Sequence, residues 1–226
     1  MAKNSVPLEL SSDDARTWWL ALMENVASLV RDSSLLADNG SPGRARSLLV
    51  LAAEELGKAR WIYEAAEESW TAGGGLVELP ADFEYRARTH PEKLAAAADY
   101  GDGNNGFWGD WFQYESGRRL VPDQQMENAN QFNLHKQAGF YVDRRNGIVT
   151  SPADINADGV NEFLDRLAKA ASMLFVEDHV RMQLQGHVRN DARQAHTMLL
   201  KCSQHRGFRE PANLLRPSAE KRLPAT

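Results

Sequence analysis

Residues 44–66 have the sequence RARSLLVLAAEELGKARWIYEAA, and this stretch decides the fold. Its apolar residues recur at steps of three and four, which is the spacing that gives an α-helix one buried face. The pattern continues to about Trp70 and stops at the three glycines of residues 73–75, which have no reason to stay helical. A long amphipathic helix is predicted. Its buried stripe contains Ala45, Leu48, Leu49, Ala52, Leu56, Ala59, Tyr63 and Ala66.

Three further segments have helical spacing, and they predict an all-α bundle of four to five main helices. The first spans about residues 11–37 and is separated from the second helix by the turn signal DNGSPG, so the two should form an antiparallel hairpin. The others run from 122 to about 137 and from 151–158 to about 185. Between the helices we expect a short helix near Pro91 and a small hairpin or loop at Asn146-Gly147, but no other run of strand-like alternation.

Composition limits the class of protein. The 226 residues are 42% hydrophobic and 25% charged, and no apolar run approaches the roughly 18 residues of a membrane span. The N-terminus lacks the apolar core of a secretory signal, and one cysteine cannot form an internal disulfide, so we expect a cytoplasmic protein. The net charge of -5 argues against broad, non-specific binding to duplex nucleic acid.

Two acidic residues on the second helix receive different predictions. Projection at about 100° per residue places Glu54 opposite the apolar stripe, where it should be solvated. The same projection places Glu55 at the edge of the stripe, where an unpaired carboxylate would be costly. Lys58 can pair with either residue. A surface ion pair explains Glu54 and Lys58, whereas partial burial of Glu55 suggests a polar network that positions functional groups.

Polar residues also interrupt the pattern elsewhere. Asp178, Arg181 and Gln185 occupy positions where the last long helix should have core residues. They could meet Glu55 and Lys58 across the bundle or across a dimer interface, or form a structural salt-bridge network. His135 and Lys136 end the third main helix; the histidine could act as an acid or base, or could simply favour the helix dipole. No spacing of histidines, acids or glycines indicates a metal, phosphate-loop or dinucleotide site, so no cofactor is expected.

Two segments have less regular patterns. The insertion at 71–122 contains five aromatic residues between 107 and 114, which could pack on the bundle or form a base-stacking or partner surface. The basic tail at 206–226 could be solvated, or could contact nucleic acid or a partner. We assign residues 1–205 to one helical domain.

Two stretches together resemble the AbiV family of abortive-infection proteins, which belongs to the HEPN superfamily of helical bundles. They are residues 44–66, with Glu-Glu-Leu-Gly-Lys, and the sequence HKQAGFYVDRRNGIVTSPADI at 135–155. The resemblance covers roughly residues 11–200 and implies bacterial anti-phage defence by a HEPN-like bundle that forms a homodimer. It further implies action on RNA or the translation machinery, with a phage protein as trigger or target.

Many HEPN proteins cut RNA without metal, using an arginine and a histidine with four to six residues between them. Both Arg181/His187 and Arg189/His196 have this spacing, and the second is the preferred pair because Asn190 follows its arginine. The resemblance thus implies a metal-independent endoribonuclease. The alternatives are a non-catalytic helical protein that arrests translation or is switched by a phage protein, and a helical scaffold in another pathway. The residues predicted to form the catalytic site are Glu55, Lys58, His135, Lys136, Arg189 and His196.

Overall fold

The computed structural model describes residues 6–101, 122–186 and 190–202. Helices dominate this part of the chain, and two small two-stranded sheets accompany them, which confirms the predicted all-α class. The helices are α1 (Ser12–Asp38), α2 (Pro42–Thr71), α3 (Phe83–Arg88), α4 (His90–Gly101), α6 (Pro122–Phe140), α7 (Val160–Leu184) and α8 (Arg193–Cys202), with a 3₁₀ turn η1 (Pro152–Asp154). The strands are β1 (Leu8–Ser11), β2 (Leu76–Leu79), β3 (Asp143–Arg145) and β4 (Ile148–Thr150).

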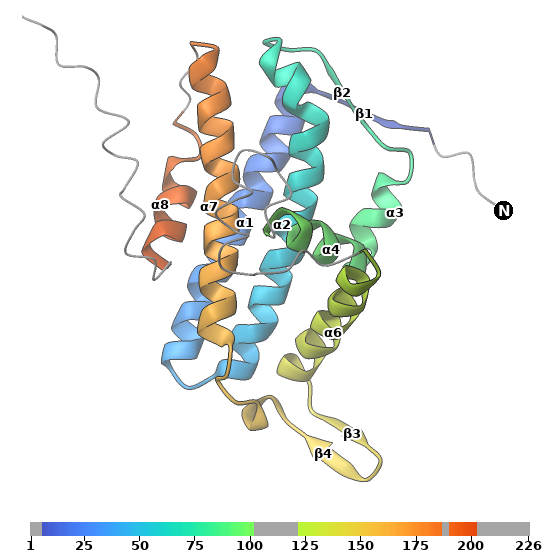
Figure 1. The fold of residues 1–226 in the computed structure, drawn as a ribbon, viewed down its shortest axis with the longest axis vertical. Helices are drawn as coiled ribbons and strands as arrows, with labels where there is room; N and C mark the ends of the chain where they lie inside the picture. The colour runs from blue at the N-terminus through green and yellow to red at the C-terminus, as the bar shows by residue number, and fades with distance from the viewer. Residues whose placement is uncertain (1–5, 102–121, 187–189, 203–226) are drawn as a thin grey trace, which may run out of the picture.

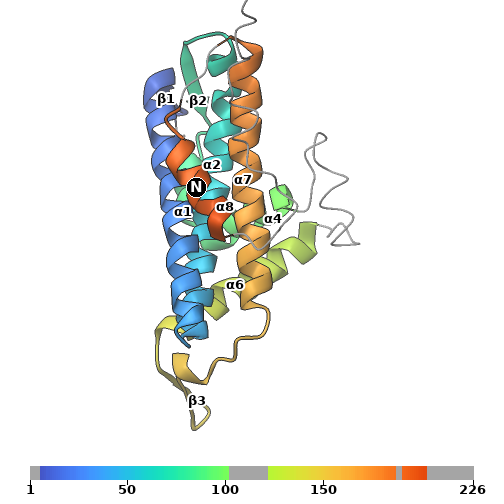
Figure 2. The ribbon, with the colours of Figure 1, turned by 90° about the vertical axis from the view of Figure 1, so that its left-hand side faces the viewer.

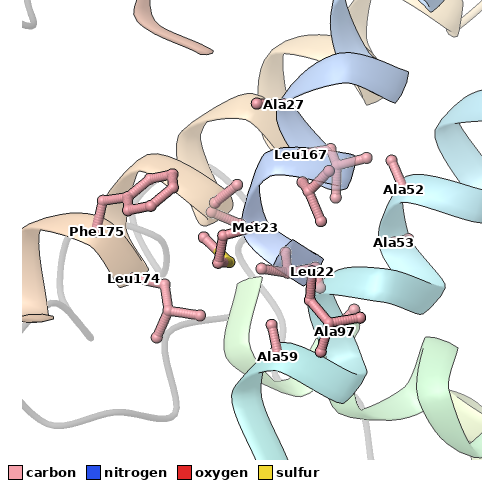
Figure 3. Close-up of a cluster of buried hydrophobic side chains, with 14 of the residues drawn as sticks. Leu22, Met23, Ala27, Ala52, Ala53, Ala59, Ala97, Leu167, Leu174 and Phe175 are labelled. Atoms are coloured by element: carbon pink, nitrogen blue, oxygen red, sulfur yellow. The ribbon is translucent and has the colours of Figure 1, made fainter. Parts of the chain in front are cut away.

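Three long helices, α1, α2 and α7, run side by side and form the centre of the bundle (Figures 1 and 2). Their apolar stripes meet along the shared axis, so that Met23 of α1 lies between Leu174 of α7 and the alanines of α2 (Figure 3). Trp19 is fully buried and contacts Phe175 edge-on at 5.7 Å. The predicted stripes on these helices therefore do form the core.

Two further helices, α4 and α6, pack on the other side of α2. Helices α4 and α6 lie against α2 and against each other, whereas α8 lies against α1 and α7 (Figures 1 and 2). Because α2 contacts helices on two sides, it is buried over far more than one stripe. This arrangement determines where the polar side chains of α2 can go.

The two small sheets differ in the sequence separation of their strands: one joins distant segments and the other is a local hairpin. Strands β1 and β2 pair antiparallel with Leu8 opposite Leu79, which ties the start of α1 to the chain after α2 and was not predicted. Strands β3 and β4 form the hairpin expected at Asn146-Gly147, which projects past the end of the bundle (Figure 1). Both turn residues have positive φ, 52° and 82°, as a two-residue hairpin turn requires.

The boundaries of the long helices lie close to those predicted. Helix α1 begins after Ser11, whose hydroxyl accepts a hydrogen bond from the Asp14 backbone at 3.1 Å. Helix α7 begins at Val160 rather than at Ser151, because Ser151 caps the separate turn η1. The aromatic residues at 107–114 and the basic tail at 206–226 lie outside the described residues. No described helix combines the length and apolarity needed to cross a membrane.

Candidate functional site

A buried carboxylate, Glu54 of α2, is the centre of a four-residue cluster that we call the Glu54 cluster. Glu54 is 2% exposed, and its Oε1 accepts a hydrogen bond from Lys136 Nζ of α6 at 2.6 Å. Its Oε2 lies 3.0 Å from Lys93 Nζ and 2.7 Å from His90 Nδ1, both from α4. Three elements that are distant in sequence therefore bring four ionisable side chains to one point.

Glycine allows α4 to come this close to α2. A Cβ placed on Gly57 would overlap the backbone carbonyl of Lys93, so only glycine lets the two helices touch at this level. Gly57 lies three residues after Glu54 and hence on the same face of α2. The close approach lets both Lys93 and His90 reach the Glu54 carboxylate.

Helix α6 is held by a second contact between small residues. A Cβ on Gly139 would overlap the Ser47 hydroxyl and the Gly43 backbone, so α6 also packs directly on the α2 backbone. The Ser47 hydroxyl donates to the Lys136 carbonyl at 2.8 Å. This bond anchors the backbone of the residue whose ammonium reaches Glu54.

The electrostatics of the cluster favour an ionised Glu54. Burial by itself raises the pKa of a carboxyl, but hydrogen bonds from Lys136, His90 and Lys93 outweigh burial and hold the pKa of Glu54 below its ordinary value of 4.5. The two lysines and one carboxylate leave a net charge of +1 when His90 is neutral. Buried charge of one sign in excess is costly and is a feature of sites that receive an anion.

The tautomer of His90 follows from its contacts. Its Nδ1 lies 2.7 Å from a carboxylate oxygen and 3.1 Å from Lys136 Nζ. A carboxylate can only accept, so Nδ1 must carry the proton and donate it to Glu54. The neutral ring therefore has its lone pair on Nε2, at the other edge of the ring. The side chain is 47% exposed, so this ring reaches solvent while its three partners are buried.

The predictions for Glu54 and Glu55 are partly wrong. Glu54 was expected in water and is instead the most buried acid on α2, because α4 and α6 cover the face opposite the apolar stripe. Glu55 does have the partner it was expected to need, since Lys58 Nζ lies 2.6 Å from its carboxylate. Their side chains are 20% and 18% exposed, so this pair lies at the margin of the packed helices.

The predicted pair His135 and Lys136 divides between two environments. Lys136 is buried and belongs to the Glu54 cluster, whereas His135 is exposed beside Phe132, with ring centroids 6.3 Å apart. Partial burial, and then the charge of Arg46, lower the pKa of His135. Adjacent residues on a helix point about 100° apart, so both side chains cannot reach Glu54.

Within one chain, the polar residues of α7 do not meet Glu55 or Lys58 across the bundle, as one interpretation had them do; they form a separate network with α1. Asp178 is 1% exposed and accepts hydrogen bonds from Arg16 Nη1 at 2.8 Å and from Arg181 Nη2 at 2.6 Å. Arg16 also contacts Asp191, at 3.0 Å. Burial lowers the pKa of Arg16, but Asp178 and Asp191 outweigh it and raise that pKa.

The predicted arginine and histidine pair is described only in part, because Arg189 lies outside the described residues. His196 lies on α8 and stacks on Phe175 of α7 with ring centroids 5.4 Å apart. Burial, and then the charge of His179, lower the pKa of His196 to about 4, so it is neutral at physiological pH. Its ring contact with Phe175 is that of a packing residue between α7 and α8.

Sequence reasoning missed His90 and Lys93, which supply two of the three partners of Glu54. A weak signal was present, because Pro91 predicted the helix that contains both residues, but nothing in the sequence placed this helix against α2. Within the described ranges, no group of three or more histidine, cysteine or acidic residues could hold a metal ion.

Comparison with known proteins agrees with the fold and with the motifs. Among curated proteins and solved structures, nothing matches the chain. The family model described as AbiV matches residues 14–172, which include most of α1, all of α2 and all four residues of the Glu54 cluster. On this match, the chain belongs to the AbiV family of the HEPN superfamily.

Proposed function

We propose that this protein is an anti-phage abortive-infection effector that cleaves RNA without a metal, and that the Glu54 cluster is its active site. The proposal depends on the Glu54 cluster, which has a net charge of +1 when His90 is neutral. In it the buried Glu54 carboxylate accepts a hydrogen bond from Nδ1 of the half-exposed His90. Membership of the AbiV family supports the role in defence, and the relation to HEPN ribonucleases supports RNA as the substrate.

The chemistry assigns one role to each residue. His90 Nε2 takes the proton of a ribose 2′-hydroxyl, whose oxygen attacks the neighbouring phosphorus while the bond to the 5′-oxygen breaks. The protonated ring returns a proton to the departing 5′-oxygen, which leaves a 2′,3′-cyclic phosphate and a 5′-hydroxyl. Glu54 orients the ring and stabilises its charged form, as a carboxylate does for a catalytic histidine.

Lys93 and Lys136 supply the positive charge that a phosphodiester requires as negative charge develops on its oxygens. Their side chains are 6% and 10% exposed, so their field acts in a medium that screens less than water. His90 thus takes the catalytic role that was predicted for His135 and His196, of which His135 is exposed outside the cluster and His196 packs against Phe175. Lys136 is kept from the residues predicted by sequence.

The test is cleavage of total bacterial RNA by purified protein in the presence of EDTA. We expect the native protein to produce ends with cyclic phosphate, and His90→Gln to reduce the rate by about 100-fold or more. His135→Gln and Glu55→Gln are matched controls that should retain the native rate. Gel filtration and circular dichroism of each variant exclude loss of fold as the cause.

Two results would remove the proposal. One is intact RNA with the native protein under conditions in which its expression protects cells from phage. The other is an unchanged rate of RNA cleavage by His90→Gln. If His196→Gln lost cleavage activity instead, the active site would be the arginine and histidine pair predicted from sequence.

A second candidate is a non-catalytic protein that arrests translation or is switched by a phage protein. The exposed apolar side chains of the β3–β4 hairpin favour it, since Val142 and Ile148 are each 67% exposed on a projecting arm. This reading predicts that a ribosomal or phage component co-purifies with the protein while RNA stays intact. Ile148→Ser should abolish that association, whereas His90→Gln should not.

A further inference from the structure

A cavity of about 550 Å³ lies at the end of the bundle remote from the β3–β4 hairpin. It is formed where α1 begins, where α2 ends and where α7 ends, and it includes no residue of the Glu54 cluster. This volume falls in the range of sites that bind small molecules. The lining residues used below are Ser12, Asp13, Arg16, Trp70, Arg181, Gln185 and the glycines at 73–75.

Two residues that line this cavity each have a buried hydrogen-bond donor without an acceptor in the described part of the chain. Arg181, whose side chain is 10% exposed, donates from Nη2 to Asp178 and from Nη1 to the Gln185 side-chain oxygen at 3.3 Å. Its Nε and the Nε2 of Gln185 are buried without a partner. Buried donors are almost always satisfied, so this pair requires an acceptor.

The charges are arranged in two layers around the cavity. Arg16 and Arg181 line it, whereas their counter-ions do not: Asp178 pairs with both arginines and Asp191 pairs with Arg16. The first turn of α1 adds the positive end of a 27-residue helix at Ser12. Asp13 also lines the cavity, but its side chain is exposed to solvent, which screens its charge.

The remaining walls leave room for a ligand. Gly73, Gly74 and Gly75 all have positive φ, at 82°, 144° and 132°, which glycine adopts readily. They are exposed and have no side chains, so their backbone borders the cavity directly. The Trp70 ring contacts both arginines, with their guanidinium carbons 5.4 and 5.3 Å from its ring centre. The arginines are thus fixed before any ligand arrives, which reduces the entropy lost on binding.

We propose that this cavity binds the phosphate or carboxylate group of a small molecule no larger than a nucleotide. Its oxyanion accepts hydrogen bonds from Arg181 Nε and Gln185 Nε2, the two donors that have no partner among the described residues. Guanidinium and amide donors that converge in this way suit planar or tetrahedral oxyanions. The site is independent of the proposed RNA cleavage, so a protein without nuclease activity would still have it.

The test measures binding of inorganic phosphate, AMP and succinate to the full chain by calorimetry and by thermal shift, with chloride at matched ionic strength as reference. We expect at least one of the three to bind and to raise the melting temperature. Binding of phosphate but not of AMP would indicate a site for the free ion. Tighter binding of AMP than of phosphate would indicate a nucleotide site, and tighter binding of succinate than of either would indicate a carboxylate site.

Gln185→Glu places a carboxylate in the cavity wall and removes one free donor, so it should weaken binding by at least about tenfold. Gln183→Glu is the matched control, because Gln183 is exposed on the same helix and contacts His179 rather than the cavity. It should bind like the native chain. Absence of binding by all three probes overturns the proposal, and so does equal binding by the native protein and Gln185→Glu.

Discussion

Replacing Glu54 by glutamine removes a charge while nearly preserving the shape of the side chain. In the native protein the carboxylate is 2.6 Å from Lys136 Nζ and 3.0 Å from Lys93 Nζ, and the lysine side chains are 10% and 6% exposed. Glutamine leaves two buried ammonium groups without a counter-ion, and loss of one partner from a buried pair costs about 3–5 kcal/mol. Against a total stability of about 5–15 kcal/mol for a domain, this loss should be large and measurable.

Glu55→Gln provides the matched control one residue along the same helix. Its carboxylate also has an ammonium at 2.6 Å, that of Lys58, but these two side chains are 20% and 18% exposed. Partly solvated pairs contribute about 0–1 kcal/mol, so the two variants should differ by at least about 2 kcal/mol in the free energy of unfolding. Urea denaturation at neutral pH measures this difference.

The same pair of variants tests the ionisation of Glu54. Because the folded-state pKa of Glu54 lies below its ordinary value of 4.5, the carboxylate stabilises the fold above that pH, and this contribution is lost as pH falls through the lowered pKa. The stability gap between the native protein and Glu54→Gln should therefore narrow in acid. Equal stability of Glu54→Gln and Glu55→Gln at neutral pH would refute the reasoning about the cluster.

Three other changes have defined outcomes. Gly57→Ala should destabilise the protein by about 1–3 kcal/mol despite the better helix propensity of alanine, because the new methyl group overlaps backbone of α4; denaturant titration measures it. Asp178→Asn should cost about 3–5 kcal/mol because Arg16 and Arg181 lose their shared partner, and thermal unfolding that matches the native protein would contradict this. His196 should remain neutral in an NMR titration down to its pKa of about 4. Since that pKa lies below the ordinary 6.5, His196 lowers stability as pH falls from 6.5 towards 4, and a titration midpoint near 6.5 would show that it is not buried.

The fold could be predicted from sequence where each segment decides its own structure. Helices α1, α2 and α7 have long apolar stripes, and their predicted ends lie within a few residues of those observed. The Asn146-Gly147 hairpin follows from turn chemistry alone. The pairing of β1 with β2 could not be predicted in this way, because strands of 4 residues carry little pattern and their partners are far apart in the chain.

The candidate site was only partly predictable, because its geometry depends on which helices touch. Lys136 was identified from its motif, and Lys58, which could have paired with either Glu54 or Glu55, pairs with Glu55. His90 and Lys93 could not be linked to Glu54, since the contact requires α4 to cross α2 at Gly57. Spacing along one helix gives no information about that crossing.

The error over Glu54 has a physical source that applies to any central helix. A projection onto one apolar stripe assumes that the opposite face is in water, but α2 is packed on both sides. The second face has its own signature, because Gly43, Ser47, Glu54 and Gly57 fall within a sector of roughly 80° at 100° per residue. Three of these four residues are small, so the backbone of a neighbouring segment can pack against them. The fourth, Glu54, forms ion pairs with Lys93 of α4 and Lys136 of α6. A helix with an apolar stripe on one side and a row of small residues on the other should thus be treated as buried on both sides. An acidic residue in that row should be treated as a candidate functional residue.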